Sequence, residues 1–506
     1  MSLPTPTYPI PLNPFHEEQP FFFNPPQDDD ELPLKEIPGS YDPPFIGAIM
    51  DRWDFYYNQG RDGFFRARQE KYKSTVFRAN APPGPFIAKE SKVVVLLDAI
   101  SFPILFDTTK VEKTNFFDTT YMPSVNFFGG YRVLAFLDPS EPKHKALKQY
   151  FFNVLASKHD NFIPLLRKSL ADLFNNLESQ LEKSKEVNFN PISDSASFNY
   201  IFELFCDKSP SKTDLGPQGN KTFVDIWLVP QVTPIVTFGV PKLLQLVEDL
   251  LIHTFPIPAF LVKGKYKTIF EAFSSSAGPT LDKAKDFGIQ RDEACHNLIF
   301  ITCFNTYGGL KVLFPALFKW LGRASPTWHA NLAKEIRNVV KQEGGVVTLA
   351  ALEKMSLLKS VVYEVLRIDP PVPFQCARAK EDLVIQSHDA SFKIKKGELI
   401  YGYQPFATKD PKVFENPETF VPYRFMGKAE ANIKYVYWSN GRETEDPTVD
   451  DKQCAGKDLV VLMARVMLVE FFLRYDTFTC TDEVFLVGSK VTFTSLTKAG
   501  TVKTKN

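Results

Sequence analysis

The chain has 506 residues, of which 44% are hydrophobic and 14% aromatic, and its 59 basic and 59 acidic residues give a formal net charge of zero. A chain of this length can form one large domain or several smaller ones, and it can enclose an internal pocket. Because it has no basic run, a nucleic-acid partner has no sequence support. Its six scattered cysteines include no CxxC pair, which favours a reducing compartment and indicates no zinc site.

The first residues differ in composition from the rest of the chain. Residues 1–32 are rich in proline, contain an acidic cluster at 28–31 and have no Lys or Arg. A secretory signal needs a basic start and a continuous apolar centre, whereas a transit peptide is basic and poor in acidic residues. We therefore expect a disordered tail over 1–32 and one continuous domain over 33–506. Because no transit peptide is evident, we expect a location in the cytoplasm or on the surface of a membrane or lipid body.

The first half of this domain begins with strands and continues with helices. The segments 74–80 and 91–98 are rich in β-branched residues, which predicts two short strands. From about 141 to 320 the apolar residues recur mostly at three- and four-residue spacing, which predicts helices. The apolar stretch 226–241 has three prolines and is too short to cross a bilayer, so we expect no transmembrane helix.

Residues 294–322 are apolar nearly all the way round, which predicts a buried central helix. Asn305, Gly308 and Gly309 lie in its middle. Each glycine costs about 1 kcal/mol relative to Ala in a helix interior, and a buried Asn needs hydrogen-bond partners. The segment is therefore either a kinked helix whose Asn satisfies itself, or a helix that passes close to a flat ligand toward which Asn305 points.

The last third of the chain adds another helix and several short strands. The predicted helix at 352–368 ends before a pair of prolines, as helices do. Strand-like segments follow at 382–387, 391–403 and 489–497. This order predicts a mainly α fold, a helix-rich body with small β-sheets at its edges.

Common enzyme motifs are missing. The segment GPQGNKT at 216–222 lacks the spacing of a phosphate-binding loop, and the chain has neither GxGxxG after a strand nor GxSxG nor HExxH. Phosphoryl transfer, hydride transfer, serine hydrolysis and zinc hydrolysis therefore lose their usual sequence support.

Four residues in the last third of the chain are chemically more informative. Glu364 and Arg367 are three residues apart on a predicted helix, so they can pair, and Arg424 follows in a proline-rich stretch. Cys454 stands at the start of a predicted apolar helix. The helix dipole and the free N–H groups of a helix N-terminus favour a thiolate. A thiolate is a good ligand for haem iron.

The order ExxR, Arg, aromatic-x-x-Gly and Cys-x-Gly resembles the cytochrome P450 superfamily. Ordinary P450s place the cysteine four residues after that glycine, whereas here Cys454 stands thirteen residues after Gly441, so 442–450 is an insertion of nine residues. The loop WSNGRETEDPTVDDKQCAGKD resembles that of the CYP74 family of plant enzymes that metabolise fatty-acid hydroperoxides. The resemblance covers nearly all of 33–500 and implies a P450 fold around a buried haem in a single catalytic domain.

The resemblance also implies which residues hold the cofactor, heme b (iron protoporphyrin IX). Cys454 is expected to be the axial thiolate ligand of the iron. The two glycines of the central helix, Gly308 and Gly309, are expected to let its backbone lie over the porphyrin. Glu364, Arg367 and Arg424 are expected to be structural. The implied cationic partners of the haem propionates are His144, Lys148, Lys452 and Lys113.

Asn305 and Phe117 are the implied catalytic residues. The FNTYGG segment lacks the acid with which a monooxygenase delivers protons to O2, and none is needed when the substrate already contains an O–O bond. The resemblance implies that Asn305 hydrogen-bonds the hydroperoxide and that no reductase takes part. The implied substrates are 9- or 13-hydroperoxides of linoleic or linolenic acid, which an upstream lipoxygenase supplies for oxylipin biosynthesis.

The resemblance leaves several products open. Phe117 and FNTYGG favour a hydroperoxide dehydratase (allene oxide synthase), because an aromatic face beside the carbon radical can assist its oxidation. Arg442 and the unusual segment 370–379 keep a divinyl ether synthase as the alternative, and a hydroperoxide lyase or epoxyalcohol synthase also stays open. A haem- or lipid-binding protein without turnover is the remaining alternative.

Overall fold

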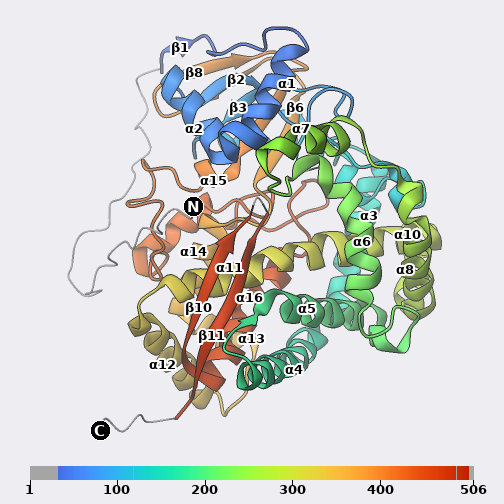
Figure 1. Ribbon diagram of the computed structural model, residues 1–506, viewed down its shortest axis with the longest axis vertical. Helices are drawn as coiled ribbons and strands as arrows, with labels where there is room; N and C mark the ends of the chain where they lie inside the picture. The colour runs from blue at the N-terminus through green and yellow to red at the C-terminus, as the bar shows by residue number, and fades with distance from the viewer. Residues whose placement is uncertain (1–31, 118, 486, 501–506) are drawn as a thin grey trace.

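A computed structural model of the chain describes residues 32–117, 119–485 and 487–500 (Figure 1). The predicted tail over 1–32 lies outside these residues except for Leu32, so it stays a prediction. The described chain is rich in helices and has three small sheets, which confirms the expected mainly α fold. Figure 1 shows two of the sheets together with α1 and α2 at one end of the molecule, and the helical body below them.

The largest sheet joins segments from both halves of the chain. Its strand order is β2-β3-β9-β6-β4, with β3 and β9 parallel and the other neighbours antiparallel. Val93 and Val95 pack in one cluster with aromatic residues of α2 and of the π-helix η1, Asp54–Asn58, that precedes it, whereas Val94 and Leu96 face the main core. The sheet is therefore covered on both faces. The strands are β1 Leu34–Lys35, β2 Val76–Asn80, β3 Lys92–Leu96, β4 Val111–Glu112, β5 Val187–Asn188, β6 Phe374–Ala379, β7 Leu383–Gln386, β8 Ser391–Ile394, β9 Leu399–Tyr403, β10 Tyr475–Val484 and β11 Ser489–Lys498.

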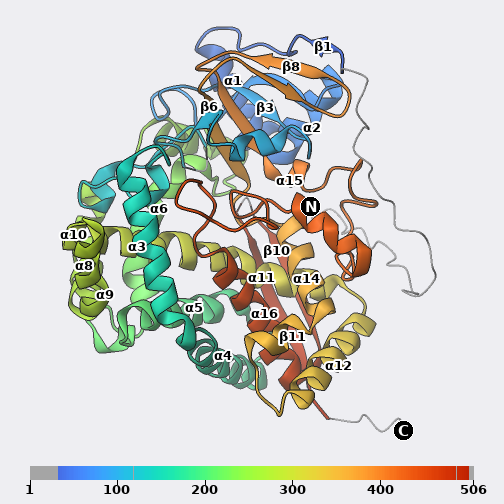
Figure 2. The ribbon, with the colours of Figure 1, turned by 180° about the vertical axis from the view of Figure 1, so that it is seen from behind.

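The helices form one body around a large apolar core. Figure 2 shows α16 in the middle of this body, where it packs against α14 and α4. The helices are α1 Ile46–Trp53, α2 Gly60–Tyr72, α3 Pro142–Lys158, α4 Phe162–Lys183, α5 Phe189–Cys206, α6 Asp225–Val232, α7 Gln245–Glu248, α8 Lys263–Ser276, α9 Gly278–Asp282, α10 Arg291–Ile299, α11 Gly308–Arg323, α12 Pro326–Gln342, α13 Leu349–Glu353, α14 Ser356–Ile368, α15 Gln404–Ala407 and α16 Lys457–Arg474.

The predicted central helix is present, but its middle is not an α-helix. Between α10 and α11 the chain forms a π-helix, η13, over Phe300–Tyr307. Gly308 and Gly309 follow as the first residues of α11, so the irregular turn precedes the glycines. Such π-helical segments are rare and occur frequently at functional sites.

This central helix, Arg291–Arg323, is long and apolar enough to cross a membrane, but 61% of its most apolar window is buried inside the molecule. Among the described residues one further pair of helical stretches, Lys242–Thr254 and Ala259–Ser276, passes the same test only when the two are taken together across a bend of 91°. The buried central helix is the core helix of a helical body.

Candidate active site

A cavity with a volume of about 290 Å³ lies between segments that are far apart in the sequence. The central helix contributes Asn305 and Gly309, and the loop that precedes α16 contributes Trp438 and Cys454. Most other lining residues are aliphatic or aromatic, and the described lining includes three lysines and one histidine but no Asp or Glu. A mostly apolar cavity with a few convergent polar groups is typical of a ligand site.

Cys454 lies at the end of the inserted loop, three residues before α16 begins. Its backbone N–H donates to the Ser439 carbonyl at 2.8 Å, and its own carbonyl accepts from the Lys457 N–H at 3.1 Å. These two bonds fix the position of the Cys454 side chain on the cavity wall. Burial raises the pKa of the Cys454 thiol, although the Gly456 N–H and the Lys148 ammonium act in the opposite direction. The Gly456 N–H at the start of α16 thus favours the thiolate, as expected, but burial outweighs it, and a bound metal ion is the group that would deprotonate this thiol.

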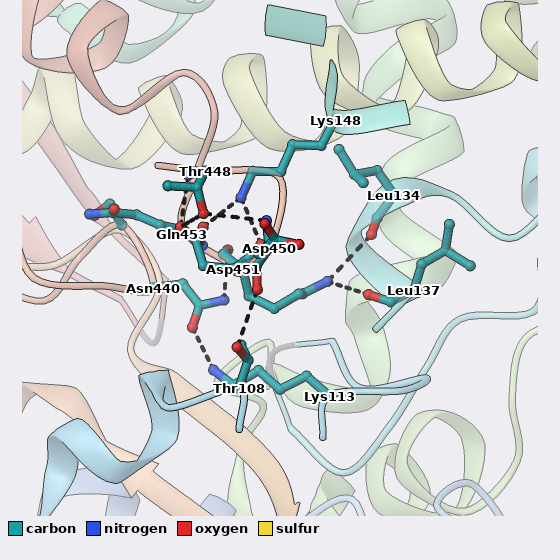
Figure 3. Close-up of polar contacts among 12 residues, drawn as sticks. Thr108, Lys113, Leu134, Leu137, Lys148, Asn440, Thr448, Asp450, Asp451 and Gln453 are labelled. Carbon is teal, nitrogen blue, oxygen red and sulfur yellow. Dashed lines mark hydrogen bonds and ion pairs between the residues drawn. The ribbon is translucent and has the colours of Figure 1, made fainter. Parts of the chain in front are cut away.

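The four predicted propionate partners all line the cavity and come from three different segments. Figure 3 labels two of them, Lys113 and Lys148, with their polar contacts. Lys113 donates to the Gln375 Oε1 at 3.1 Å and to the Asn440 Oδ1 at 2.5 Å. Lys148 donates to Asp451 at 2.6 Å. Burial lowers the pKa of Lys113 to about 7, because its neighbours in hydrogen-bond distance are neutral.

Lys452 is bonded in the same way as Lys113, whereas His144 is a neutral imidazole. The Lys452 ammonium donates to the backbone carbonyls of Ala135 at 2.8 Å and Leu137 at 2.9 Å, and burial lowers its pKa to about 7. His144 is 2% exposed, its Nδ1 has no hydrogen-bond partner, and burial lowers its pKa to about 3. The cavity thus collects two ammonium groups, Lys113 and Lys452, that no carboxylate of the described lining neutralises, and an imidazole nitrogen of His144 without a hydrogen-bond partner.

These features fit haem. Buried cations need a counter-charge, and the two propionates of a haem would supply it at Lys113 and Lys452, which bond only neutral oxygens. Lys148 already pairs with Asp451 and would be a further partner of the propionates. At Gly309 no protein atom lies within 4 Å of the place that a Cβ would occupy, so the helix backbone is open toward the space it lines. Gly308 has the same open space but does not line the cavity, so its predicted contact with the porphyrin stays a prediction.

Asn305 is in the π-helix η13 and its side chain is exposed to the cavity. Within the described part of the chain its amide has no hydrogen-bond partner, so the alternative of a self-satisfied Asn is wrong. Phe304 and Tyr307 from the same turn are buried in the core. An amide of this kind can donate a hydrogen bond to a ligand in the cavity without giving up a protein contact.

Phe117 lines the same cavity. Its ring packs edge to face against Phe304 at 4.9 Å and Phe136 at 6.1 Å between ring centroids. Aromatic pairs prefer this geometry. The position of Phe117 is therefore coupled through Phe304 to the π-helical turn that carries Asn305.

The three predicted structural residues form one buried network. Arg367 donates to both carboxylate oxygens of Glu364, at 2.7 and 2.9 Å, and Arg424 donates to Glu364 at 2.9 Å. Arg367 also donates to the carbonyls of Thr408 and Pro417. The network ties α14 to the segment that leads into the inserted loop, and neither Glu364 nor Arg367 is on the surface.

Several residues that hold the site together were not predicted from the sequence. Gln375 and Asn440 are the acceptors for Lys113, and Asp451 is the partner of Lys148. Within the insertion, Glu443 accepts a hydrogen bond from Tyr363 at 3.1 Å, and burial raises the pKa of Glu443 to about 7. Only one of these residues had a sequence signal: Gln375 lies in the segment 370–379, which departs from the family pattern.

Comparison with known proteins agrees with this geometry. A cytochrome P450 family model matches residues 320–495. The chain is 55% identical to allene oxide synthase 3 of Solanum lycopersicum over 92% of this chain and 95% of that protein. It is 50% identical to allene oxide synthase CYP74A2 of Parthenium argentatum, over 93% and 99%, and 49% identical to divinyl ether synthase CYP74D1 of Solanum lycopersicum, over 92% and 98%. The chain belongs to the CYP74 family of cytochromes P450.

Proposed function

We propose that this protein is a haem-thiolate hydroperoxide dehydratase, an allene oxide synthase, which converts fatty-acid hydroperoxides without O2 or a reductase. The observation that carries the proposal is one cavity that joins Cys454 to the unpartnered amide of Asn305 and contains no Asp or Glu in its described lining. Relatives named allene oxide synthase support it at 49–55% identity.

Dehydration needs no outside electrons. The hydroperoxide loses one molecule of water, and the oxidation of its carbon skeleton is balanced by the reduction of its own O–O bond. When bound, heme b would supply an iron that cleaves this O–O bond, with the Cys454 thiolate donating electron density that favours scission. A cavity without an acid is suited to such a substrate, because no proton has to be delivered to O2.

The chain's own residues would bind the cofactor and orient the hydroperoxide. Lys113, Lys148 and Lys452 would pair with the propionates, and Cys454 would hold the iron. The Asn305 amide would donate to a hydroperoxide oxygen and fix its orientation, which is the kind of alignment that lowers a barrier. Phe117 and the apolar walls would exclude water from the carbon radical.

The divinyl ether synthase alternative rests on relatives at 49% identity and on Arg442. In the structure the Arg442 side chain pairs with Glu445 at 3.6 Å and is not among the residues that line the cavity. Phe117, which favours the dehydratase, does line it. These positions support the allene oxide as the product, and the preference between 9- and 13-hydroperoxides, made by an upstream lipoxygenase, stays open.

The test is anaerobic incubation of the purified ferric protein with 9- and 13-hydroperoxides of linoleic and linolenic acid, without reductase, and identification of the products by mass spectrometry. Ketols formed from an allene oxide support the proposal. Divinyl ethers or short aldehydes would keep the reaction class and change the product. A haem-loaded protein that consumes no hydroperoxide would leave only the non-catalytic alternative.

We also propose that the protein attaches to the surface of a membrane or lipid body. A group of exposed apolar side chains, here named the α7 patch, surrounds α7, which lies beside α1 in Figure 1. Exposed lysines at 242, 263 and 267 border it and would attract anionic lipid headgroups. An exposed apolar group of this size is typical of an interaction site. The α7 patch consists of Phe238, Leu243, Leu244, Leu246, Val247, Leu250, Leu251, Phe255, Phe260 and Leu261.

Attachment is tested by sedimentation with phosphatidylcholine vesicles, with and without phosphatidylserine. The variant Leu243→Ser/Leu246→Ser is expected to remain in the supernatant, because both side chains, 90% and 68% exposed, would lose their burial in lipid. The matched control is Val384→Ser, which is 60% exposed on β7 and lies outside the patch. Equal sedimentation of the two variants would contradict the proposed surface.

A further inference from the structure

Tyr307 belongs to the same π-helical turn as Asn305, but it does not line the cavity. A helix turns by about 100° per residue, so side chains two residues apart project toward roughly opposite sides. Tyr307 is 0% exposed, and its hydroxyl donates to the Asp225 Oδ1 at 3.0 Å. Asn220 donates to the same hydroxyl at 3.3 Å. The side of the turn that faces away from the cavity is thus held by hydrogen bonds.

One turn later, Lys311 joins the same group. Its ammonium donates to the Asp225 Oδ1 at 2.8 Å and pairs with the Asp194 Oδ2 at 3.2 Å. Asp194 comes from α5 and Asp225 from the start of α6, so three separate segments meet at the central helix. We name Tyr307, Lys311, Asp225, Asp194 and Asn220 the Tyr307 cluster.

The charges of this cluster do not balance. Two carboxylates share one ammonium, and the Asp194 Oδ1 is buried without a hydrogen-bond partner. Burial raises the pKa of Asp194 to about 6, with Lys311 acting against this and Asp225 adding to it. Lys221 is the other charged group near Asp194 and lowers its pKa slightly. Burial alone would lower the pKa of Lys311, but Asp194 and Asp225 outweigh it.

Lys311, Asp225 and Asp194 are partly buried, and a network of this kind with an unpaired oxygen lowers stability compared with a well-packed apolar contact. Its location gives it a use. A π-helical turn is strained relative to an α-helix, so it persists only where its surroundings hold it. Among the described side chains of η13, that of Tyr307 makes hydrogen bonds to other parts of the helical body, with Asp225 and Asn220. Removing it would release the turn without changing the cavity wall.

We propose that the Tyr307 cluster is a positioning device, which holds η13 in its π-helical form and so fixes where the Asn305 amide lies in the cavity. The inference rests on the proposed function in one respect, because the reaction that Asn305 serves is the one proposed above. Tyr307 and its partners touch neither substrate nor cofactor. They act through the backbone of the turn, so the cost of losing them is expected in kcat rather than in KM.

The experiment compares two buried hydroxyls in the haem-loaded enzyme. Tyr307→Phe removes the hydroxyl of the cluster. Tyr200→Phe removes an equally buried hydroxyl on α5, which donates to the Phe162 carbonyl at 3.3 Å. For Tyr307→Phe we expect kcat to fall by about tenfold or more with little change in KM, because a misplaced group loses most of its effect. We expect faster amide hydrogen exchange in the peptide covering 300–311. Tyr200→Phe is expected to leave both quantities unchanged, even where its melting temperature falls.

Equal kcat and equal exchange in the two variants would overturn the inference. If Tyr307→Phe does not fold, Asp225→Asn is measured in the same way, since it keeps an acceptor for Tyr307 and removes the charge that holds Lys311. The hydrogen-exchange result is independent of turnover. A parent enzyme that consumes no hydroperoxide would therefore defeat the proposed function, while unchanged exchange in Tyr307→Phe would defeat the positioning role.

Discussion

Two groups of buried charges in this molecule differ in what neutralises them. In the first, Glu364 supplies the carboxylate for Arg367 and Arg424, and backbone carbonyls accept the remaining N–H groups. In the second, Lys113 and Lys452 bond only neutral oxygens, and the described cavity lining has no acidic residue. The first group contains its own carboxylate, whereas the second requires an anion from a ligand. The difference separates a structural network from a binding site without reference to any motif.

The largest expected effect comes from breaking the complete group. Glu364→Gln leaves Arg367 and Arg424 buried without a counter-charge, and we expect a loss of about 3–5 kcal/mol in the free energy of unfolding. The measurement is urea unfolding of the haem-loaded protein. Glu445→Gln is the control, because its pair with Arg442 is largely exposed and should change stability by less than about 0.5 kcal/mol. A loss of similar size in both variants would contradict this account.

The next effect concerns a cavity group with no protein partner. Asn305→Leu should lower kcat for hydroperoxides by about 100-fold, the usual cost of removing one preorganised donor. Its stability should change little, because no described residue loses a hydrogen bond. Steady-state kinetics and thermal unfolding of the same preparation give both numbers. Unchanged turnover would remove Asn305 from the mechanism.

The next prediction concerns how the stability of the haem-free protein depends on pH through Lys113, which has no carboxylate partner. Burial holds the pKa of Lys113 at about 7, below its usual 10.5, so between these values the unfolded chain binds more protons than the folded one. Stability of the haem-free protein should therefore rise as pH increases from 7 to 10.5, by at most about 1.4 kcal/mol per pH unit for one proton.

Lys113→Met should flatten this rise and also weaken haem retention, measured by loss of the haem absorbance on dilution. Lys110→Met is the control, because Lys110 is half exposed and its partner Asp107 is on the surface side of the same segment. If the stability of the haem-free Lys110→Met variant also does not change with pH, Lys113 has a counter-charge within the protein and this prediction is wrong.

The smallest expected effect concerns Asp194. Its folded pKa is about 6 against the usual 3.8, so the folded protein binds more protons in this window and loses stability as pH rises from 3.8 to 6. Asp194→Asn should therefore raise the free energy of unfolding by about 1 kcal/mol at pH 7.5, and the gain should vanish below pH 4. Thermal unfolding across this range measures it. A variant that is less stable than the parent at pH 7.5 would mean that Lys311 outweighs the cost of burial.

The strands that were predicted and those that were missed differ in their flanks. β2 and β3 were found because β-branched residues lie between turn residues. β10 was missed because Tyr475 follows directly after α16, without Gly or Pro, so the apolar run reads as more helix. β6 follows two prolines and mixes Gln, Cys, Ala and Arg, which have no clear strand preference.

The residues of the candidate site also divide into those that could be predicted from the sequence and those that could not. Cys454, Glu364 and Arg424 could be found because their spacing is a sequence property. The π-helical turn could not, since its cause lies in contacts from α5 and α6 that no local pattern encodes. Lys113 was predicted only through the family resemblance, because no local pattern encodes its burial. The structure places it directly after β4, where its side chain is buried.

The sheet order β2-β3-β9-β6-β4 has a consequence for biosynthesis. Two of its strands are made when about four fifths of the chain has left the ribosome, and they must insert between β3 and β4, which were made near the start. Contacts between such distant residues form late and slowly. Lys113 meets Gln375 only across this sheet, and Cys454 is made later still. The cofactor therefore has no assembled site on the nascent chain, and its capture is expected to be among the last steps of folding.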